Sequence, residues 1–364
     1  MIRAINAIIL AFGSVGVLSS ISTLAHPAWG IVVDRQGQVY FSDLKNIWKI
    51  DTQGKLSVFR GGTDTHTHEL NIDEAGNVYG EDNFSAIWKM TPEGGFSYIS
   101  SPTDNPQKGI SIWRDRGGNM YSVEQDNNLK RQTLLLKRTP GGDISVLAGG
   151  SYGHADGKGG LAKFRNIVGL SFGPDGSLYL TDGSSVRRVA TDGTVTTIVR
   201  NIVVETPLGH QEGEPAPTYL FGITVNAQGN AFVADYGNRR VLKIAPDGGL
   251  TVLIQTDENW FPTGVAAKGD ELYILEESHT REHKPIGTRV RKLSTDGDVT
   301  VLATIKENGA SSGSSAVVDS AGRKSELDHK ISYALIGAGV TLCALTVIVW
   351  SIRRRRFVSQ HKSS

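Results

Sequence analysis

Two histidines stand two positions apart in the stretch DTHTHEL, which covers residues 64–70. On a β-strand, His66 and His68 would face the same way, because successive side chains alternate between the two faces. Two neutral imidazoles and a carboxylate form a ligand set for a divalent metal such as Zn or Ca. Asp64 and Glu69 supply nearby carboxylates, although Glu69 would point the opposite way on a regular strand. The hypothesis is a metal site at His66, His68 and Glu69, and the alternative is chance proximity.

Two other stretches place histidines and acids in predicted loops. Residues 277–287, ESHTREHKPIG, contain His279 and His283, and residues 201–222 contain His210 among acids and prolines. Long loops on a rigid scaffold are where binding surfaces usually form. Both stretches are therefore candidate binding loops. The alternative is that they are surface insertions without a function.

Aromatic and basic residues stand where the predicted repeat units begin. Trp and Tyr suit a sugar or peptide ligand, because the ring stacks and the polar group forms hydrogen bonds. The alternative is that these side chains only fill space between sheets. With the loop histidines, the candidate ligand-binding residues are His26, Trp29, Arg165, Tyr219, Phe261, His279 and His283. We find no serine-nucleophile elbow, phosphate-cradling loop or paired-cysteine motif, so no residue is assigned a catalytic role.

These residues are distributed over a repeat that recurs six times. The aligned segments, each covering a first and a second strand, are residues 30–43, 69–82, 111–124, 169–182, 222–235 and 264–276. A third apolar run, a turn rich in Asp-Gly or Gly-Gly, and a fourth run follow each segment, which is the chemistry of antiparallel hairpins. Several runs are apolar on both faces, as expected for sheets covered on both sides. The pattern predicts an all-β, six-bladed β-propeller over residues 26–305, closed by packing between its first and last units.

Each repeat has an acid at the end of its second strand: Asp43, Asp82, Glu124, Asp182, Asp235 and Glu276. A binding site is rarely sixfold, so this recurrence favours a structural role. We expect these carboxylates to accept backbone N–H groups of the following turn.

The two ends of the chain have the composition of membrane-targeting segments. Residues 1–25 resemble a signal peptide, with Arg3 before an apolar stretch and small residues before the predicted cleavage. Residues 306–330 are rich in Ser, Gly and charge and predict a flexible stalk. Residues 331–352 carry no charge and predict a transmembrane helix, and four arginines in residues 353–364 place that tail in the cytoplasm. The propeller is therefore expected outside the cytoplasm, in the periplasm or at the cell surface.

The repeat resembles that of the NHL-repeat propellers, within the gluconolactonase/TolB-like superfamily. The likeness is strongest in GNAFVADYGNRRVLKIAPDGG, residues 229–249, and in residues 147–193, where Ile167 stands at the usual proline position. The family includes scaffolds, receptor ectodomains and enzymes, so the resemblance is specific for fold and weak for function. Some members bind RNA through a basic face. The extracytoplasmic location and the balance of 38 Lys+Arg against 37 Asp+Glu argue against nucleic acid here.

Two functions follow as expectations. The first is a membrane-anchored binding module that recognises a protein, peptide or glycan with its loop-bearing face. The alternative is a metal-dependent lactonase-like hydrolase or lyase with its site in the axial channel, as similar propellers imply. Two departures weaken the alternative: His26 stands where the lactonases have a glutamate, and the single Cys343 excludes the intramolecular disulfides of the amidating lyases.

Overall fold

The computed structural model describes residues 27–62, 66–83, 86–101, 108–125, 132–202, 220–257, 259–279 and 285–306. The chain divides into two units, Met1–Ala321 and Gly322–Ser364, and every described residue belongs to the first. The predicted signal peptide, transmembrane helix and basic tail, and the stalk from residue 307 onward, lie outside the described residues. Within the described ranges, no helix has the length and apolar character needed to cross a membrane.

Six sheets make up the fold, and we number them as blades 1 to 6 in chain order. Blades 1 to 3 consist of β1 (Ile31–Val33), β2 (Val39–Ser42), β3 (Asn46–Ile50) and β4 (Leu56–Gly61); β5 (Thr67–Ile72), β6 (Val78–Asp82), β7 (Ala86–Met90) and β8 (Phe96–Ser100); β9 (Trp113–Arg114), β10 (Met120–Gln125), β11 (Gln132–Arg138) and β12 (Ile144–Ser151). Blades 4 to 6 consist of β13 (Gly157–Lys158), β14 (Ile167–Phe172), β15 (Leu178–Asp182), β16 (Ser185–Val189) and β17 (Thr194–Val199); β18 (Leu220–Val225), β19 (Ala231–Asp235), β20 (Arg240–Ile244) and β21 (Leu250–Gln255); β22 (Trp260–Lys268), β23 (Glu271–His279), β24 (Pro285–Leu293) and β25 (Val299–Lys306). A 3-10 turn, η1 (Gly159–Leu161), follows β13.

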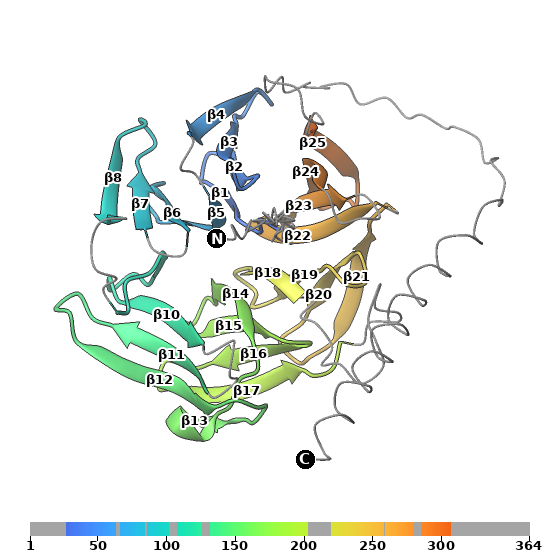
Figure 1. The fold of residues 1–364 in the computed structure, drawn as a ribbon. Helices are drawn as coiled ribbons and strands as arrows, with labels where there is room; N and C mark the ends of the chain where they lie inside the picture. Colours follow the sequence, from blue (N-terminus) through green and yellow to red (C-terminus); the bar gives the residue numbers. More distant parts are fainter. Residues whose placement is uncertain are drawn as a thin grey trace, which may run out of the picture. The chain divides into compact units, whose positions relative to one another are not determined.

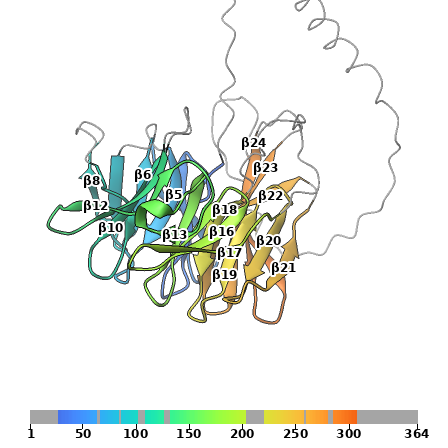
Figure 2. The same cartoon turned by 90° about the horizontal axis from the view of Figure 1, so that it is seen from below.

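Within each blade, consecutive strands pair antiparallel from an inner first strand to an outer fourth strand. The inner strands β14, β18, β22 and β1 contact one another in that order, and β1 also contacts β5. The blades therefore surround a common axis (Figure 1), and their strands stand upright when the ring is viewed from the side (Figure 2). The predicted all-β, six-bladed propeller is confirmed.

The hairpins follow the turn chemistry of the sequence. In the turn between β1 and β2, the carboxylate of Asp34 accepts the backbone N–H groups of Gly37 and Gln38, both at 2.8 Å. Gly37 has a φ of 95°, a left-handed conformation that glycine adopts without steric cost. The same turn with an aspartate recurs in blades 2 and 3, which explains the repeated DxxG pattern.

The structure departs from six equal units of four strands in three places. Blade 4 has a fifth strand, because β13 in the glycine-rich segment pairs with the outer strand β17. Blade 3 begins with β9, which is only two residues long. The strands of blade 6 are long, and β23 extends to His279, so the predicted 277–287 loop begins inside a strand.

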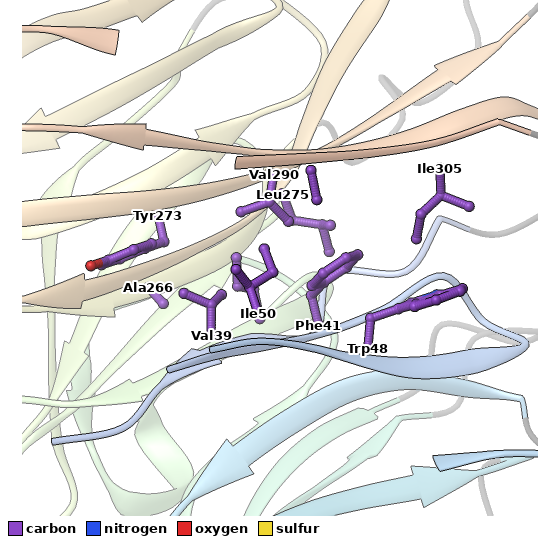
Figure 3. Packing of buried hydrophobic residues seen from close by; sticks show 11 residues of the cluster. Val39, Phe41, Trp48, Ile50, Ala266, Tyr273, Leu275, Val290 and Ile305 are labelled. Carbon is purple, nitrogen blue, oxygen red and sulfur yellow. The ribbon is translucent and has the colours of Figure 1, made fainter. Parts of the chain in front are cut away.

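Packing closes the ring between blades 1 and 6. One buried cluster joins residues of both blades (Figure 3), including Val39, Phe41, Trp48 and Ile50 from blade 1 and Ala266, Tyr273, Leu275, Val290 and Ile305 from blade 6. Within the described part of the chain, each sheet contains strands from one repeat only, so blades 1 and 6 share no strand. Side-chain burial, as the sequence predicted, holds the first and last blades together.

Glycine sets the spacing of the inner strands on one side of the ring. Blades 1, 4, 5 and 6 have glycine at the equivalent first-strand position, namely Gly30, Gly169, Gly222 and Gly264. A Cβ on Gly222 would lie 2.8 Å from the Cα of Gly264, so these inner strands approach backbone to backbone. Blades 2 and 3 have Glu69 and Ser111 at this position. Side chains therefore occupy the space between inner strands in this sector.

Candidate functional site

A row of rings crosses the end of the axis at which the first strands begin. We call it the axial ring row, and in order of contact it consists of His66, His68, Trp29, Phe221, Tyr236, Phe261 and His279. Successive ring centroids lie 4.8, 5.2, 5.8, 5.2, 4.9 and 6.1 Å apart, which is the range of favourable ring contacts. The row takes residues from blades 1, 2, 5 and 6.

The repeat explains why these side chains meet. Trp29, His68 and Phe221 occupy the same position in three blades, directly before the aligned first-strand residue. Tyr236 follows the end of the second strand β19, and antiparallel pairing returns that end to the start of β18. Trp29 of blade 1 contacts Phe221 of blade 5 across the intervening blade 6, so the row spans the axis.

A buried imidazole and a buried carboxylate end the row on blade 6. The side chains of His279 and Glu277 are 7% and 9% exposed, and His279 Nε2 lies 3.4 Å from Glu277 Oε2. The other oxygen, Glu277 Oε1, accepts the backbone N–H of Ala28 at 2.7 Å. Neither ring nitrogen of His279 has a hydrogen-bond partner among the described residues. This end of the row therefore holds polar atoms that are shielded from water and whose hydrogen-bonding capacity is not fully used by the described residues.

The carboxyl group of Glu69 adjoins the row beside Trp29. Burial raises the pKa of Glu69 to about 8, while the indole N–H groups of Trp113 and Trp29 act in the opposite direction and Glu81 adds to the rise. Trp113 Nε1 donates to Glu69 Oε2 at 3.1 Å. At neutral pH this group is mostly a carboxylic acid, so it can donate its own proton in a hydrogen bond.

The segment before β1 is fixed to two other blades. The backbone N–H groups of Trp29 and Gly30 donate to the carbonyl of His68, at 2.9 and 2.8 Å. His68 Nδ1 lies 3.3 Å from the carbonyl oxygen of Pro27. With the contact of Ala28 to blade 6, these bonds hold Trp29 in place at the centre of the row.

The metal hypothesis concerns residues at the other end of the row. The rings of His66 and His68 meet edge to face, and Glu69 turns away to bind the indole of Trp113. Within the described ranges, no three His, Cys, Asp or Glu side chains are grouped so as to hold a metal ion. Asp64, the other carboxylate near the two histidines, lies outside the described residues. The metal site and the metal-dependent alternative therefore stay predictions from sequence.

The predicted ligand residues divide into three groups. Trp29, Phe261 and His279 meet in the axial ring row together with His66 and His68. Arg165 is exposed at the start of blade 4, and its backbone N–H donates to Asp182 at 2.7 Å. His26, Tyr219 and His283 lie outside the described residues.

Sequence reasoning missed Phe221, Tyr236, Trp113 and Glu277. The position of Phe221 carries a signal in the sequence, because Phe221 precedes the first-strand glycine as Trp29 does. Glu277 was placed in a loop without a role, and Trp113 was not considered, because their partners come from distant blades.

The strand-end acids have structural partners, with one change from expectation. Asp43 accepts the backbone N–H groups of Lys45 and Asn46, at 2.9 and 2.6 Å, as predicted. In four blades an arginine is instead a main partner: Asp82 with Arg60, Asp182 with Arg187, Asp235 with Arg240, and Glu276 with Arg289 and Arg291. These pairs fix the ends of the second strands that bear the row.

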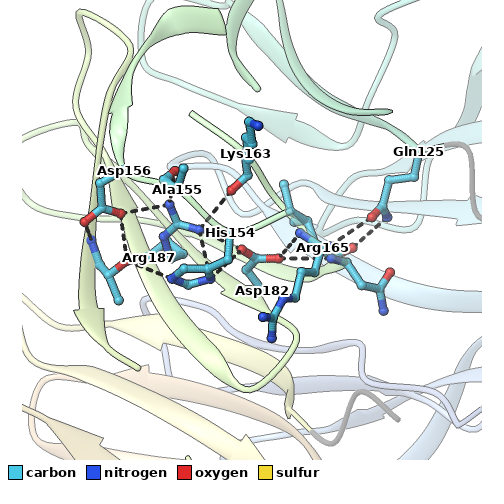
Figure 4. Close-up of polar contacts among 11 residues, drawn as sticks. Gln125, His154, Ala155, Asp156, Lys163, Arg165, Asp182 and Arg187 are labelled. Atoms are coloured by element: carbon cyan, nitrogen blue, oxygen red, sulfur yellow. Dashed lines mark hydrogen bonds and ion pairs between the residues drawn. The ribbon is translucent and has the colours of Figure 1, made fainter. Parts of the chain in front are cut away.

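Blade 4 contains the most extensive of these networks (Figure 4). The fully buried guanidinium of Arg187 donates to Asp182 at 2.8 Å, to Asp156 at 2.9 Å and to the carbonyl of Ala155 at 2.8 Å. Burial and the charge of Arg187 lower the pKa of the adjacent His154, so its ring is neutral at neutral pH. Every acceptor of the Arg187 guanidinium comes from within the blade and its glycine-rich segment, so we assign this network to stability. Gln125 of blade 3 adds a link to the preceding blade, because its side-chain oxygen accepts the backbone N–H of Ile167 at 2.9 Å (Figure 4).

Comparisons with known proteins bear on the fold. No protein-family model matches the chain, and no curated protein sequence matches it. Virginiamycin B lyase from Staphylococcus aureus is similar in structure at 18% identity, with 76% of this chain and 83% of that chain covered and a TM-score of 0.45. A gluconolactonase from Xanthomonas campestris has 15% identity, coverage of 69% and 84%, and a TM-score of 0.46. A structure of the nidogen–laminin complex shares 14% identity with this chain, covers 60% of this chain and 75% of its own, and has a TM-score of 0.40. These likenesses concern the six-bladed propeller, and membership of the NHL-repeat family stays a prediction.

Proposed function

We propose that this propeller is a binding module that holds a protein, peptide or glycan segment over the axial ring row. The observation that carries the proposal is the continuous contact of rings from four blades across the axis. Trp and Tyr present large, rigid and amphipathic surfaces at little cost in conformational entropy, which suits recognition.

The polar groups beside the row suggest which ligand atoms it would meet. A buried polar atom without a partner raises the free energy of the free protein, and a ligand that supplies the partner recovers it. His279 would exchange a hydrogen bond with a hydroxyl or amide of the ligand. The protonated carboxyl of Glu69 would donate to a carbonyl or hydroxyl oxygen. The preferred ligand is therefore uncharged and rich in hydroxyl or amide groups where it meets the row.

The proposed location follows from the ends of the sequence. Residues 1–25 have the pattern of a signal peptide, and residues 331–352 form an uncharged run followed by Arg353 to Arg356. We propose that the propeller stands outside the cytoplasm on a single membrane anchor, with the C-terminus inside. This placement favours a partner at the cell surface or in the periplasm.

The test is a ligand screen with the full-length protein in detergent, against a glycan array and a library of uncharged peptides. Any binder is then measured against Trp29→Ala and Tyr236→Ala, which remove rings from the centre of the row. We expect each variant to weaken binding about fivefold or more, because ring stacking contributes on the order of 1 kcal/mol or more per ring.

The matched control is Phe96→Ala, since Phe96 lies on the outer strand of blade 2 and is 46% exposed. This variant should bind as the wild type does. Equal losses in the control and in the row variants would place the ligand elsewhere. Binding that strengthens as the pH rises above 8 would contradict the role given to the neutral Glu69.

A further inference from the structure

One hydrogen bond recurs between neighbouring blades, and we call it the interblade clasp. A backbone N–H two residues before the aligned first-strand position donates to the residue that directly follows the strand-end acid of the preceding blade. The clasp joins Thr67 to the carbonyl oxygen of Leu44 at 3.2 Å, Ile167 to Oε1 of Gln125 at 2.9 Å, and Ala28 to Oε1 of Glu277 at 2.7 Å. The last of these clasps crosses from blade 6 to blade 1, where the ring closes.

Gln125 shows what the clasp needs. Its side-chain oxygen accepts the N–H of Ile167, and its Nε2 donates to the carbonyl oxygen of the same residue at 2.8 Å. A side-chain amide suits this task because it carries an acceptor and a donor side by side. Glu277 stands at the equivalent position of blade 6, and an ionised carboxyl group only accepts. Glu277 therefore repeats the first bond of the clasp and cannot repeat the second.

The second carboxylate oxygen lies beside an imidazole of the axial ring row instead. Glu277 Oε2 is 3.4 Å from Nε2 of His279, and both side chains are almost completely buried. Burying a charge costs more free energy than burying an amide, so a glutamine here would hold Ala28 with less loss of stability. The clasp alone therefore does not account for an acid at this position. The neighbouring His279 does, because a ring N–H can donate to the carboxylate.

We infer that Glu277 is a positioning residue: its Oε2 accepts the Nε2–H of a neutral His279 and leaves Nδ1 of that ring as a hydrogen-bond acceptor. In a neutral imidazole one nitrogen donates and the other accepts, so the partner of one nitrogen decides the role of the other. Neither nitrogen is hydrogen-bonded within the described residues, and the Nε2 contact must shorten by about half an ångström to become a regular N–H···O bond.

This role of Glu277 rests on the proposed function only for the ligand. A ligand over the axial ring row that reaches Nδ1 of His279 would have to donate to it, through a hydroxyl or an N–H group. The same carboxylate holds Ala28, the residue before Trp29, so one side chain connects the hydrogen-bonding end of the row to its central ring. Glu277 therefore sets both the polarity of His279 and the position of Trp29.

The test is nitrogen-15 NMR of the histidine side chains in the full-length protein, in detergent at pH 8, where an ordinary imidazole is neutral. Correlations of the ring nitrogens with the ring protons distinguish the two tautomers, and the His279 signals are those missing from His279→Gln. We expect the wild type to hold the proton on Nε2. In Glu277→Gln the amide oxygen must stay at Ala28, which puts the amide N–H₂ group beside Nε2. The dominant tautomer should therefore shift to the one with its proton on Nδ1.

A matched control and a second variant separate the two roles of Glu277. Gln125→Ala removes the clasp between blades 3 and 4 and should leave the His279 signals unchanged. In Glu277→Ala the amide hydrogen of Ala28 loses its acceptor and should exchange with solvent at least about tenfold faster than in the wild type. Glu277→Gln keeps an oxygen for Ala28 and should restore the slow exchange.

Two results would overturn the inference. One is a wild-type His279 with its proton on Nδ1, since Nε2 would then not donate to Glu277. The other is the same tautomer in the wild type and in Glu277→Gln. The wild-type spectrum alone gives the first result, so it does not depend on how well the variants fold. Because no ligand is used, failure of this test and failure of the ligand screen are distinguishable.

Discussion

The carboxyl group of Glu69 opposes folding at neutral pH. It stands where four other blades have glycine, and its pKa is about 8 in the folded protein against an ordinary value of 4.5. Between these values the unfolded chain releases a proton that the folded chain retains. Stability from this group is therefore complete below about pH 4.5 and is lost as the pH rises toward 8. This acid replaces the glycine of four other blades and lies beside Trp29 and Trp113, so its cost is paid at the edge of the proposed binding surface.

Replacing this acid with its neutral isostere should remove the pH dependence. We expect Glu69→Gln to raise the free energy of unfolding at pH 8 by about 2 kcal/mol and to change it little at pH 4. Thermal unfolding of the full-length protein across this pH range measures both values. The control is Glu74→Gln, because Glu74 forms exposed ion pairs with Arg35 and Arg116. A gain that is the same at pH 4 and pH 8 would disprove the raised pKa.

Among the arginines that the structure describes, Arg187 has the most completely buried side chain. Its side chain and that of Asp182 are both 0% exposed. We expect Arg187→Met to destabilise the protein by about 3–5 kcal/mol, because it leaves the carboxylate of Asp182 buried without its cation. Adding Asp182→Asn in the same chain should recover part of that loss. Urea unfolding provides the measurement.

Arg188 offers a matched control one position away. Its side chain is 35% exposed, and it pairs with Asp175 at the surface. Arg188→Met should cost less than about 1 kcal/mol, as exposed ion pairs do. If the two substitutions lowered the free energy of unfolding by similar amounts, burial would not explain the expected difference between the two arginines.

At the scale of the strand, the inner glycines decide how closely two blades approach. A Cβ on Gly264 would meet the backbone carbonyl of Trp29 and lie 2.9 Å from Cγ2 of Ile31. Gly264→Ala should therefore destabilise the ring by about 1–3 kcal/mol through overpacking. It should also displace Trp29, and with it the centre of the axial ring row.

Gly160 is the control for this substitution, because a Cβ there would have nothing within 4 Å. Gly160→Ala should leave the melting temperature within about 2 °C of the wild type. Near-ultraviolet circular dichroism should report the displaced tryptophan in Gly264→Ala alone. An unchanged melting temperature in Gly264→Ala would contradict the backbone-to-backbone packing of blades 6 and 1.

The strands themselves were readable from the sequence, and their exceptions were not. Apolar runs and Asp-Gly turns recur with nearly constant spacing, so local chemistry was enough to place four strands in each unit. The strand β13 has the sequence Gly-Lys, which has no strand propensity of its own. It exists because the edge of β17 accepts it. The extension of β23 to His279 likewise depends on partners in β22 and β24, which a local pattern does not contain.

At the scale of the whole molecule, the candidate site was predictable only in part. Trp29, Phe261, His66, His68 and His279 were all selected from sequence, but as two separate sites, a metal centre and a ligand surface. The ring geometry merges them, because every first strand begins at the same end of the axis. Phe221 and Tyr236 connect Trp29 to Phe261 in the axial ring row. Their residue types alone do not indicate a site, so only their positions in the propeller give them a role.

Closure by packing makes the junction of blades 1 and 6 unlike the other junctions, which also have a covalent connection. Phe41 of β2 lies at the centre of this packing and is 0% exposed. We expect Phe41→Ala to cost about 3–5 kcal/mol, as loss of a buried phenylalanine does. The loss of stability should be confined to blades 1 and 6. Hydrogen exchange should accelerate most in β1–β4 and in β22–β25, because both blades at the junction lose their cover and can open without unfolding the rest.

Phe232 gives the same substitution at a junction that the chain also connects. It is 5% exposed and packs between blades 5 and 6, which β21 and β22 join directly in sequence. Phe232→Ala should lower stability by a similar amount but accelerate exchange across neighbouring blades, since the covalent connection keeps blade 5 beside blade 6. If Phe41→Ala instead accelerated exchange equally in all six blades, the ring would open as one cooperative unit. Closure would then depend on more than the cluster between its first and last blades.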